Sequence, residues 1–171
     1  MVNKCKAVNM KKDKYRLHEI AKENSTMSTI KEFQGNYRFL SNFWPVEIAW
    51  GGRVYPSVEH AFQAMKCAND KDKDAFTHGT ARQAKRLGRS VTMRKDWNSI
   101  KLATMYALLV IKFKNPELRK LLLDTGNSIL QEGNYWHDTF WGVDLNTGSG
   151  ANNLGKLLMK VRKEIQEDNS K

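Results

Sequence analysis

The sequence predicts an α+β fold: a helix-rich single domain with a few short strands on one side. The chain has 171 residues, the size of one domain, and 40% of them are hydrophobic, enough to bury a core. Several segments carry apolar residues at helical spacing. Short β-rich runs, bounded by glycine or proline, lie between them, and no internal repeat is visible.

Local signals fix the elements expected in the first half of the domain. Gly51-Gly52 between two β-rich runs predicts a hairpin, and Ser57 predicts a helix N-cap. Gly88 ends a short basic helix. The expected elements are a strand at 30–33, a turn at 35–36, a hairpin at 46–50 and 53–55, a helix from Ser57 to about 68, a solvated charge cluster at 69–74 and a helix at 80–87.

The second half is predicted to be mainly helical. A helix at 99–113 is apolar nearly all round, which indicates packing on every side. The next helix begins at Pro116 and ends before Gly126, as helix-terminal preferences favour. A strand at 128–131 and a glycine-rich loop at 142–150 then precede an amphipathic helix from Asn153 to about Ile165.

The charge balance indicates a polyanionic partner. Lys and Arg number 29 against 18 Asp and Glu, a net charge of +11, which suits nucleic acid, a phosphorylated small molecule or an anionic membrane. The longest apolar stretch, 102–113, is too short to span a bilayer, and the N-terminus has no secretory apolar core. Cys5 and Cys67 lie in unrelated contexts, which is typical of reduced thiols in the cytoplasm.

No metal or cofactor is expected from the sequence. His60, Cys67 and His78 are the residues from which a zinc site would have to be built. A set of four clustered ligands is not visible among them.

Residues 1–28 differ from the domain, which spans 29–171. They carry seven Lys or Arg and three Asp or Glu, few large apolar residues, and a polar stretch at their end. We interpret them as a basic N-terminal extension. A loosely docked tail and a basic arm that touches phosphates are both open.

The helix after Ser57 has two faces. Val58, Ala61, Phe62 and Met65 form an apolar stripe, whereas Glu59, Gln63 and Lys66 form a second stripe with His60 beside it. Spacing alone favours a solvated Glu/Gln/Lys ladder for the second stripe. A functional face is the alternative.

The helix at 99–113 raises a question about its lysines. Lys101, Met105, Leu108 and Lys112 fall on one face. A lysine at each end of a buried helix is costly unless its amine reaches solvent or binds something. Snorkelling to solvent is the default interpretation, and a pocket for phosphate or sugar is the alternative.

The segment after Gln131 concentrates chemically useful side chains. Acidic residues and a histidine alternate with aromatic residues, an arrangement that suits either a pocket for a planar base or a hydrophobic lid. The run TGSGANN before the last helix offers backbone N–H groups that can cradle a phosphate, but it matches neither the P-loop nor the dinucleotide GxGxxG spacing. The residues concerned are Glu132, Tyr135, Trp136, His137, Asp138, Phe140, Trp141 and Asp144.

Several motifs, in order, resemble the NADAR (NAD and ADP-ribose) family, also called YbiA-like. They are FLSNFWP, YPSVEHAFQAMK, LGRS followed by RKDW, KFKNPELRKLLLDTG, DTFWG and NNLGKLLMKVR, and they cover about residues 30–165. The positions that match the family's motifs are Asn42, Phe43, Glu59, His60, Gln63, Lys66, Arg89, Trp97, Lys101, Lys112, Glu132, Asp138, Trp141, Gly142 and Asn153.

The resemblance implies a YbiA-like fold and an N-glycosidase that cleaves the bond between a ribose anomeric carbon and an amine. Such a reaction needs one carboxylate for the cationic sugar or the water, and one acid for the leaving amine. We expect Glu59 and Asp138 in these roles, with Glu132 in reserve. A Schiff base on Lys66 or Lys101 is the alternative route.

The remaining matched positions are expected to bind substrate. Cationic side chains would hold phosphate oxygens, and aromatic side chains would stack the base or exclude water. The expected phosphate ligands are Arg89, Lys66 and Lys101. The expected aromatic contacts are Trp97, Trp141 and Phe43. The other expected substrate contacts are Asn42, His60, Gln63, Gly142 and Asn153.

The resemblance implies two substrate classes. The positive charge and an arginine-rich segment at 82–94 favour ADP-ribose on guanine in nucleic acid. A phosphoribosylamino-pyrimidine intermediate of riboflavin synthesis, which needs only two or three cations, is the alternative. A non-catalytic module that binds ADP-ribose or NAD is a third interpretation.

Overall fold

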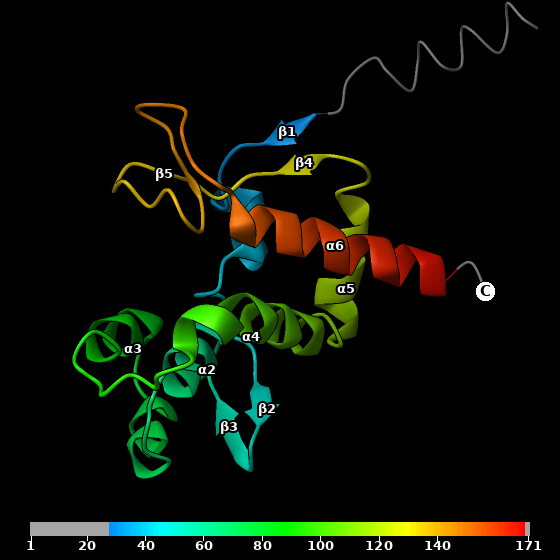
Figure 1. Ribbon diagram of the computed structural model, residues 1–171. Helices are drawn as coiled ribbons and strands as arrows, with labels where there is room; N and C mark the ends of the chain where they lie inside the picture. Colours follow the sequence, from blue (N-terminus) through cyan, green and yellow to red (C-terminus); the bar gives the residue numbers. More distant parts are fainter. Residues whose placement is uncertain (1–27, 170–171) are drawn as a thin grey trace, which may run out of the picture.

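Three helices form the centre of the molecule (Figure 1). The computed structural model describes residues 28–169. Helix α4 (Trp97–Lys112) packs against both α2 (Val58–Met65) and α6 (Asn153–Asp168). In α6 the buried positions Leu154, Leu158, Val161 and Ile165 recur every three or four residues, so the amphipathic helix predicted there is confirmed.

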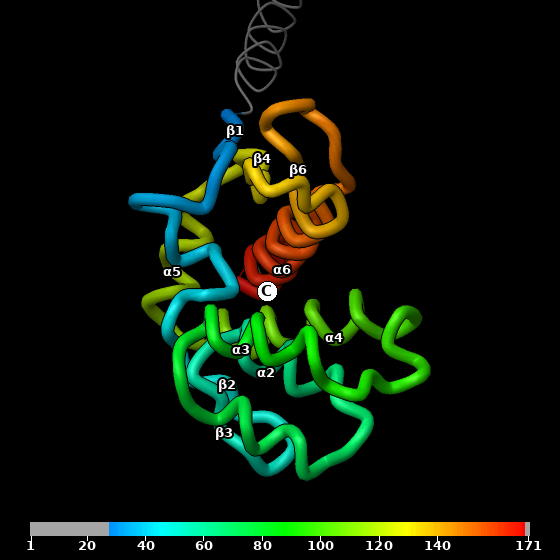
Figure 2. Tube along the Cα trace, turned by 90° about the vertical axis from the view of Figure 1, so that its left-hand side faces the viewer, coloured from blue at the N-terminus to red at the C-terminus, as the bar shows by residue number. Residues whose placement is uncertain are grey.

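The short strands lie at two ends of this helical centre, as Figure 2 shows. At one end β1 (Thr29–Ile30) runs parallel to β4 (Ile129–Leu130), and β5 (Gly133–Asn134) runs parallel to β6 (Val143–Asp144). At the other end β2 (Ile48–Trp50) and β3 (Arg53–Tyr55) form the predicted hairpin. The expectation that all strands lie on one side was therefore wrong, because the hairpin covers the far side of α2 and α4.

Local signals placed most elements correctly. Gly51 and Gly52 both have positive φ, as a two-residue hairpin turn requires. Asn115 accepts hydrogen bonds from two backbone N–H groups at the start of α5 (Pro116–Asp124). A capping box between Thr80 and Gln83 begins α3 (Ala81–Leu87).

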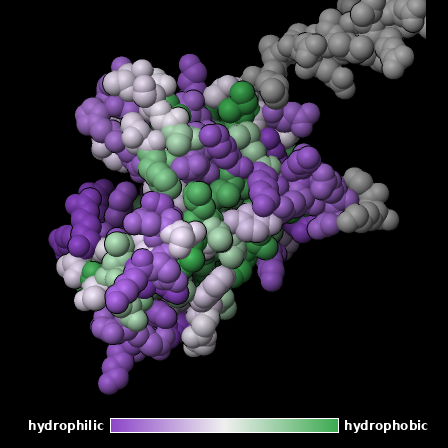
Figure 3. Space-filling view, in the orientation of Figure 1, coloured by the Kyte–Doolittle hydropathy of each residue, from purple (hydrophilic) through white to green (hydrophobic). Residues whose placement is uncertain are grey.

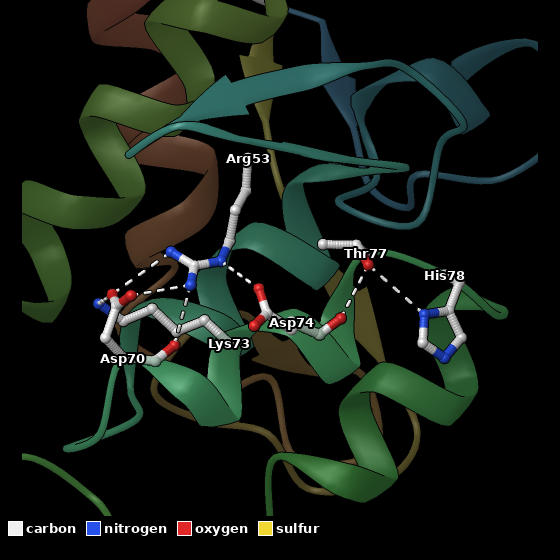
Figure 4. Close-up of polar contacts among 6 residues, drawn as sticks. All are labelled: Arg53, Asp70, Lys73, Asp74, Thr77 and His78. Carbon is white, nitrogen blue, oxygen red and sulfur yellow. Dashed lines mark hydrogen bonds and ion pairs between the residues drawn. The ribbon is translucent and has the colours of Figure 1, made fainter.

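Two expected irregular segments are short 3-10 helices. Residues at the predicted turn form η1 (Gly35–Leu40), and the charge cluster overlaps η2 (Lys71–Phe76). Arg53 joins η2 to the hairpin through Asp70 and Asp74, with Nη2–Oδ2 and Nε–Oδ1 distances of 2.8 and 2.6 Å (Figure 4). The cluster is exposed, as predicted, but it is tied to β3.

Helix α4 is not enclosed on every side. Met105, Leu108 and Leu109 are buried, whereas Leu102 is 41% exposed and Ala103 is also exposed. The apolar residues of α4 are spread around the whole helix because some of them lie on the protein surface, which is common in folded proteins. Other elements do not cover the helix on every side.

Candidate active site

A cleft opens between the helices α2, α3 and α4 and the segment that contains β5. In Figure 3 it lies on the left, between the segment that contains β5, above, and helix α3, below. Its walls come from distant parts of the sequence. The lining residues are Ser41, Asn42, Phe43, Glu59, Phe62, Gln63, Lys85, Met105, Glu132, Asn134, Trp136, Asp138, Trp141 and Leu154.

Helix α2 provides the first wall. Glu59 lies in its first turn, and its backbone N–H donates to the Asn42 carbonyl at 3.0 Å. The Gln63 amide donates to Glu59 Oε1 at 2.9 Å, one helical turn away. Glu59 and Gln63 are only 6% and 8% exposed, so these two residues of the stripe form a cleft wall, and the solvated ladder favoured by spacing was wrong.

Burial raises the pKa of Glu59 above the usual glutamate value, because a carboxylate is poorly solvated there. The hydrogen bond from Gln63 and the positive charges of Lys85 and Lys66 oppose this rise, whereas the charge of Asp138 adds to it. Glu59 and Asp138, far apart in the chain, therefore act on each other across one cleft.

Glu132 is the second acid with an altered pKa. Burial, together with the charge of Asp138, raises its pKa to about 7. Its Oε2 atom is buried and has no hydrogen-bond partner among the described residues. A carboxyl group of this kind holds its proton near neutral pH and can donate it to a bound group.

The opposite wall is an irregular segment held by side-chain amides. Asn134 Oδ1 accepts the N–H groups of Trp136 and Asp138 at 3.3 and 2.9 Å, and its Nδ2 donates to the carbonyls of Asp138 and Val143. Asp138 Oδ1 in turn accepts the N–H groups of Phe140 and Trp141 at 3.1 and 2.8 Å. These bonds fix both the acid and the aromatic rings that follow it.

Aromatic rings form the sides of the cleft. Phe62 lies edge-on to Trp141 with ring centroids 5.4 Å apart, and Trp136 is 58% exposed at the rim. Trp97 does not line the cleft. It is 5% exposed and packs behind Phe62 at 4.8 Å, so the structure gives it a supporting position rather than direct contact with a base.

Lys85 is the only lysine or arginine among the described residues that line the cleft. Its Nζ lies 5.8 Å from the centre of the Phe43 ring. The three cations expected to hold phosphate lie elsewhere. Lys66 Nζ donates to the Gly88 carbonyl at 2.7 Å, Lys101 Nζ lies 4.1 Å above the Phe140 ring, and Arg89 is exposed beyond α3.

Other matched positions support the cleft without lining it. His60 is buried, with Nδ1 2.7 Å from Ser57 Oγ and Nε2 3.3 Å from the Gly79 carbonyl. Asn153 Nδ2 donates to the Phe140 carbonyl at 2.8 Å. A side chain at Gly142 would overlap the Glu132 carbonyl oxygen, so glycine is required for the close approach of these two segments.

The glycine-rich run before α6 does not offer a free phosphate cradle. The N–H groups of Ala151, Asn152, Asn153 and Leu154 already donate to carbonyls of residues 139–142. This corrects the phosphate-binding interpretation of TGSGANN. The same bonds attach the start of α6 to the aromatic segment of the cleft.

Metal and membrane features were sought in residues 28–169. No group of three or more His, Cys, Asp or Glu side chains there is arranged to hold a metal ion. No helix in the same range has the length and apolar character to cross a bilayer. The segment 1–28 falls outside the described residues except at its end.

Sequence reasoning missed several lining residues. Lys85 was one of many basic residues near the arginine-rich segment, and helical spacing alone did not separate it from the exposed ones. Asn134 carried no motif signal, because its role depends on backbone groups that approach only after folding. The lining residues not singled out as site residues are Ser41, Phe62, Lys85, Met105, Asn134, Trp136 and Leu154.

Known proteins resemble this chain in sequence and in fold. The family model described as the NADAR domain matches residues 5–166. The chain is 38% identical over 136 residues to the N-glycosidase YbiA of Escherichia coli, covering 76% of this chain and 82% of that protein. The NMR structure of E. coli YbiA superimposes with a TM-score of 0.75 at 34% identity, covering 85% of this chain and 90% of that one.

A longer relative also matches. The chain is 39% identical over 136 residues to a riboflavin biosynthesis protein of Vibrio vulnificus, covering 77% of this chain. It spans only 36% of the length of that protein. The similarity therefore concerns one part of the Vibrio protein.

Proposed function

Since the chain belongs to the NADAR domain family and is a hydrolase of N-glycosyl bonds, we propose that it cleaves the bond between the anomeric carbon of a phosphorylated ribose and an amine on a planar base. The observation that carries this proposal is the meeting of Glu59, Glu132 and Asp138 in one cleft with a single lysine. Acids with raised pKa values beside a further carboxylate suit general acid–base catalysis.

Hydrolysis follows from this arrangement in one sequence of bond changes. The protonated Glu132 gives its proton to the leaving amine as the C1′–N bond breaks. The sugar passes through an oxocarbenium-like state, which negative charge on Glu59 and Asp138 stabilises. Water attacks C1′ and gives its proton to Glu59. The products are the free amine and a ribose with a C1′ hydroxyl, and the steps use side chains and water only.

The aromatic rim suits the base that carries the amine. Trp136, Trp141 and Phe43 lie around the mouth of the cleft and present flat apolar surfaces. Stacking on them would hold the leaving group and exclude bulk water. This assignment replaces Trp97, which lies behind Phe62.

The cleft favours a substrate with one phosphate near the sugar. Lys85 alone provides positive charge on its wall, because Lys66, Arg89 and Lys101 lie outside it. One ammonium group matches a ribose 5-phosphate better than a pyrophosphate. We therefore propose a phosphoribosylamino-pyrimidine as substrate, in keeping with the name of the Vibrio relative, and place the reaction in the reducing cytoplasm, where a free thiol such as Cys67 persists.

ADP-ribose on guanine in nucleic acid is the second candidate. Helix α3 carries Lys85 into the cleft while Arg82 and Arg86 on the same helix, and Arg89 just beyond it, are exposed. Such a basic ridge beside the cleft is suited to backbone phosphates. Figure 3 shows the hydrophilic surface over this region.

The direct test compares the two substrates. The purified chain is incubated separately with the phosphoribosylamino-pyrimidine and with DNA carrying ADP-ribosylated guanine, and the released amine and sugar are measured by chromatography. Release from the pyrimidine riboside at a rate at least tenfold higher supports our proposal. Preferential release from DNA supports the second candidate. Binding of either compound without release would overturn the enzyme assignment.

Borohydride separates the water mechanism from a Schiff base. Lys85 is the lysine with access to the cleft, whereas Lys66 and Lys101 are not on its wall. We expect no mass increase on the protein after borohydride treatment during turnover. A trapped sugar adduct would contradict direct attack by water.

A further inference from the structure

Lys112, the last residue of α4, is the most deeply buried charged group of the described chain. It is 0% exposed, so its amine does not snorkel to solvent. Nζ donates to the Ser41 carbonyl at 2.8 Å, across 71 positions of sequence. No carboxylate forms an ion pair with it among residues 28–169. Burial lowers the pKa of Lys112 to about 7. Burying an amine without an acidic partner lowers the stability of the fold. The presence of Lys112 at this place therefore suggests a function.

The Ser41 carbonyl belongs to a segment that the cleft depends on. Ser41, Asn42 and Phe43 all line the cleft but belong to no helix or strand. The next carbonyl, that of Asn42, accepts the N–H of Glu59 at 3.0 Å. Lys112 therefore holds one end of a short irregular segment that also contacts the first turn of α2 and, through Asn42 Nδ2, Met105 of α4.

We propose that Lys112 is a positioning residue for the hydrolysis proposed above, because its buried amine holds the Ser41–Phe43 wall against the start of α2 and so fixes Glu59 in the cleft. It acts through the Ser41 carbonyl and touches no substrate, since Lys112 is not among the lining residues. This inference rests on the proposed function for its kinetic consequences but not for its structural ones.

The charge of Lys112 also acts on Glu132. Burial and Asp138 raise the pKa of Glu132, and Lys85, Arg38 and Lys112 oppose that rise. In return, the Glu132 carboxylate favours the charged form of Lys112. Loss of the amine should therefore raise the pKa of Glu132 further.

The test compares Lys112→Met with Lys114→Met. Methionine keeps most of the side-chain volume and removes the amine, and Lys114 is an exposed lysine two positions away. We expect Lys112→Met to lower kcat for the pyrimidine riboside at least tenfold with little change in KM. Its alkaline limb of activity should move to higher pH, and Lys114→Met should match the wild type. An unchanged kcat and limb in Lys112→Met would overturn the proposal.

A substrate-free measurement keeps this inference separate from the proposed function. Hydrogen exchange at the Glu59 amide should accelerate at least tenfold in Lys112→Met and remain unchanged in Lys114→Met. If neither wild type nor Lys114→Met releases product, the proposed function fails, while this exchange result still decides the positioning role. Unchanged exchange would contradict it.

A second variant covers the case in which Lys112→Met does not fold. Lys112→Gln retains a hydrogen-bond donor at shorter reach. Exchange at its Glu59 amide should be faster than in wild type, but by less than the tenfold acceleration expected when the amine is lost. NMR titration of wild-type Lys112 Cε should show a midpoint near pH 7, coupled to the Glu132 carboxyl carbon. An ordinary lysine midpoint without any coupled change at Glu132 would also overturn the proposal.

Discussion

The two walls of the cleft are built in different ways. On the α2 wall, Glu59 and Gln63 stand one helical turn apart, and the helix backbone alone sets their spacing. On the opposite wall, Trp136 and Asp138 are placed by the side chain of Asn134, which makes four hydrogen bonds to the segment 136–143. A helix tolerates a change of one side chain, whereas a segment held by one amide does not.

Because of this difference, substitutions on the two walls should differ in how they affect catalysis and stability. Substitutions on the α2 wall should change the reaction and leave stability nearly intact. Substitutions on the Asn134 wall should change both together, because the acid and the rings lose their support. The predictions below, taken from the largest expected effect on turnover to the smallest, test that separation.

Glu59→Gln should lower turnover at least about a hundredfold, since it removes the proton acceptor and the negative charge beside the sugar. The glutamine keeps the size of the side chain, and the melting temperature should stay close to that of wild type. Steady-state kinetics and thermal unfolding measure the two quantities. Glu47→Gln, at an exposed glutamate outside the cleft, is the matched control. Turnover near the wild-type rate in a folded Glu59→Gln would remove Glu59 from the mechanism.

Asn134→Ala should destabilise the protein by about 2 kcal/mol, since it leaves buried N–H and C=O groups unpaired. We expect turnover to fall by roughly ten- to thirtyfold in the folded protein, because Asp138 is no longer held. Denaturant unfolding and kinetics report these effects. Asn127→Ala, at an exposed asparagine, controls for loss of an amide alone. Full stability in Asn134→Ala would show that the two walls do not differ as described.

The pH dependence of activity should identify Glu132 as the acid. With its pKa at about 7, kcat/KM should fall about tenfold for each unit of pH above that value. Glu132→Gln should lower activity and abolish this limb. A limb that persists in Glu132→Gln would assign the acid to another group.

The stability of the folded protein should also depend on pH through Glu132. Because the folded pKa of Glu132 lies above that of an unfolded glutamate, the folded state holds the extra proton between about pH 4.5 and 7. The contribution of Glu132 is therefore present at low pH and is lost as the pH rises through that window. Glu132→Gln should flatten the curve of unfolding free energy against pH there.

Lys85→Met should raise KM about tenfold for the phosphorylated riboside and leave KM for its dephosphorylated form nearly unchanged, because a charged hydrogen bond to phosphate is lost. Lys101→Met is the control, since Lys101 lies above Phe140 and outside the cleft. Its effect should stay within about threefold, the scale of an exposed cation–π contact. Equal effects in both variants would mean that phosphate is not held by the cleft lysine.

The sequence predicted the elements well because their signals are local. Gly51-Gly52, the Ser57 cap and the spacing of α6 each act within a few residues, and the motifs brought Glu59 and Asp138 to attention together. The burial of individual side chains was harder to predict. Helical period assigns a residue to a face but does not say what covers that face, so spacing alone favoured a solvated stripe at Glu59 and Gln63, and only the family resemblance placed them in the site.

The two lysines of α4 illustrate the same limit. Lys101 and Lys112 share a face by spacing, yet Lys101 lies over an aromatic ring at half exposure and Lys112 is fully enclosed. The difference comes from the segment around Ser41, which returns to the end of α4 from 71 positions away. Contacts between residues so far apart in sequence produce no periodic pattern in the sequence from which they could be predicted, and neither do the hydrogen bonds of Asn134.

The attachment of residues 139–142 to the first turn of α6 has a consequence for how ligands enter and leave. Because backbone bonds join these residues to a long helix, the aromatic rim is preorganised before any ligand arrives. Binding then forfeits little conformational entropy, and release requires no lid to open. We expect exchange at the amides of residues 151–154, which donate these bonds, to be equally slow with and without ligand, and product departure to be insensitive to solvent viscosity.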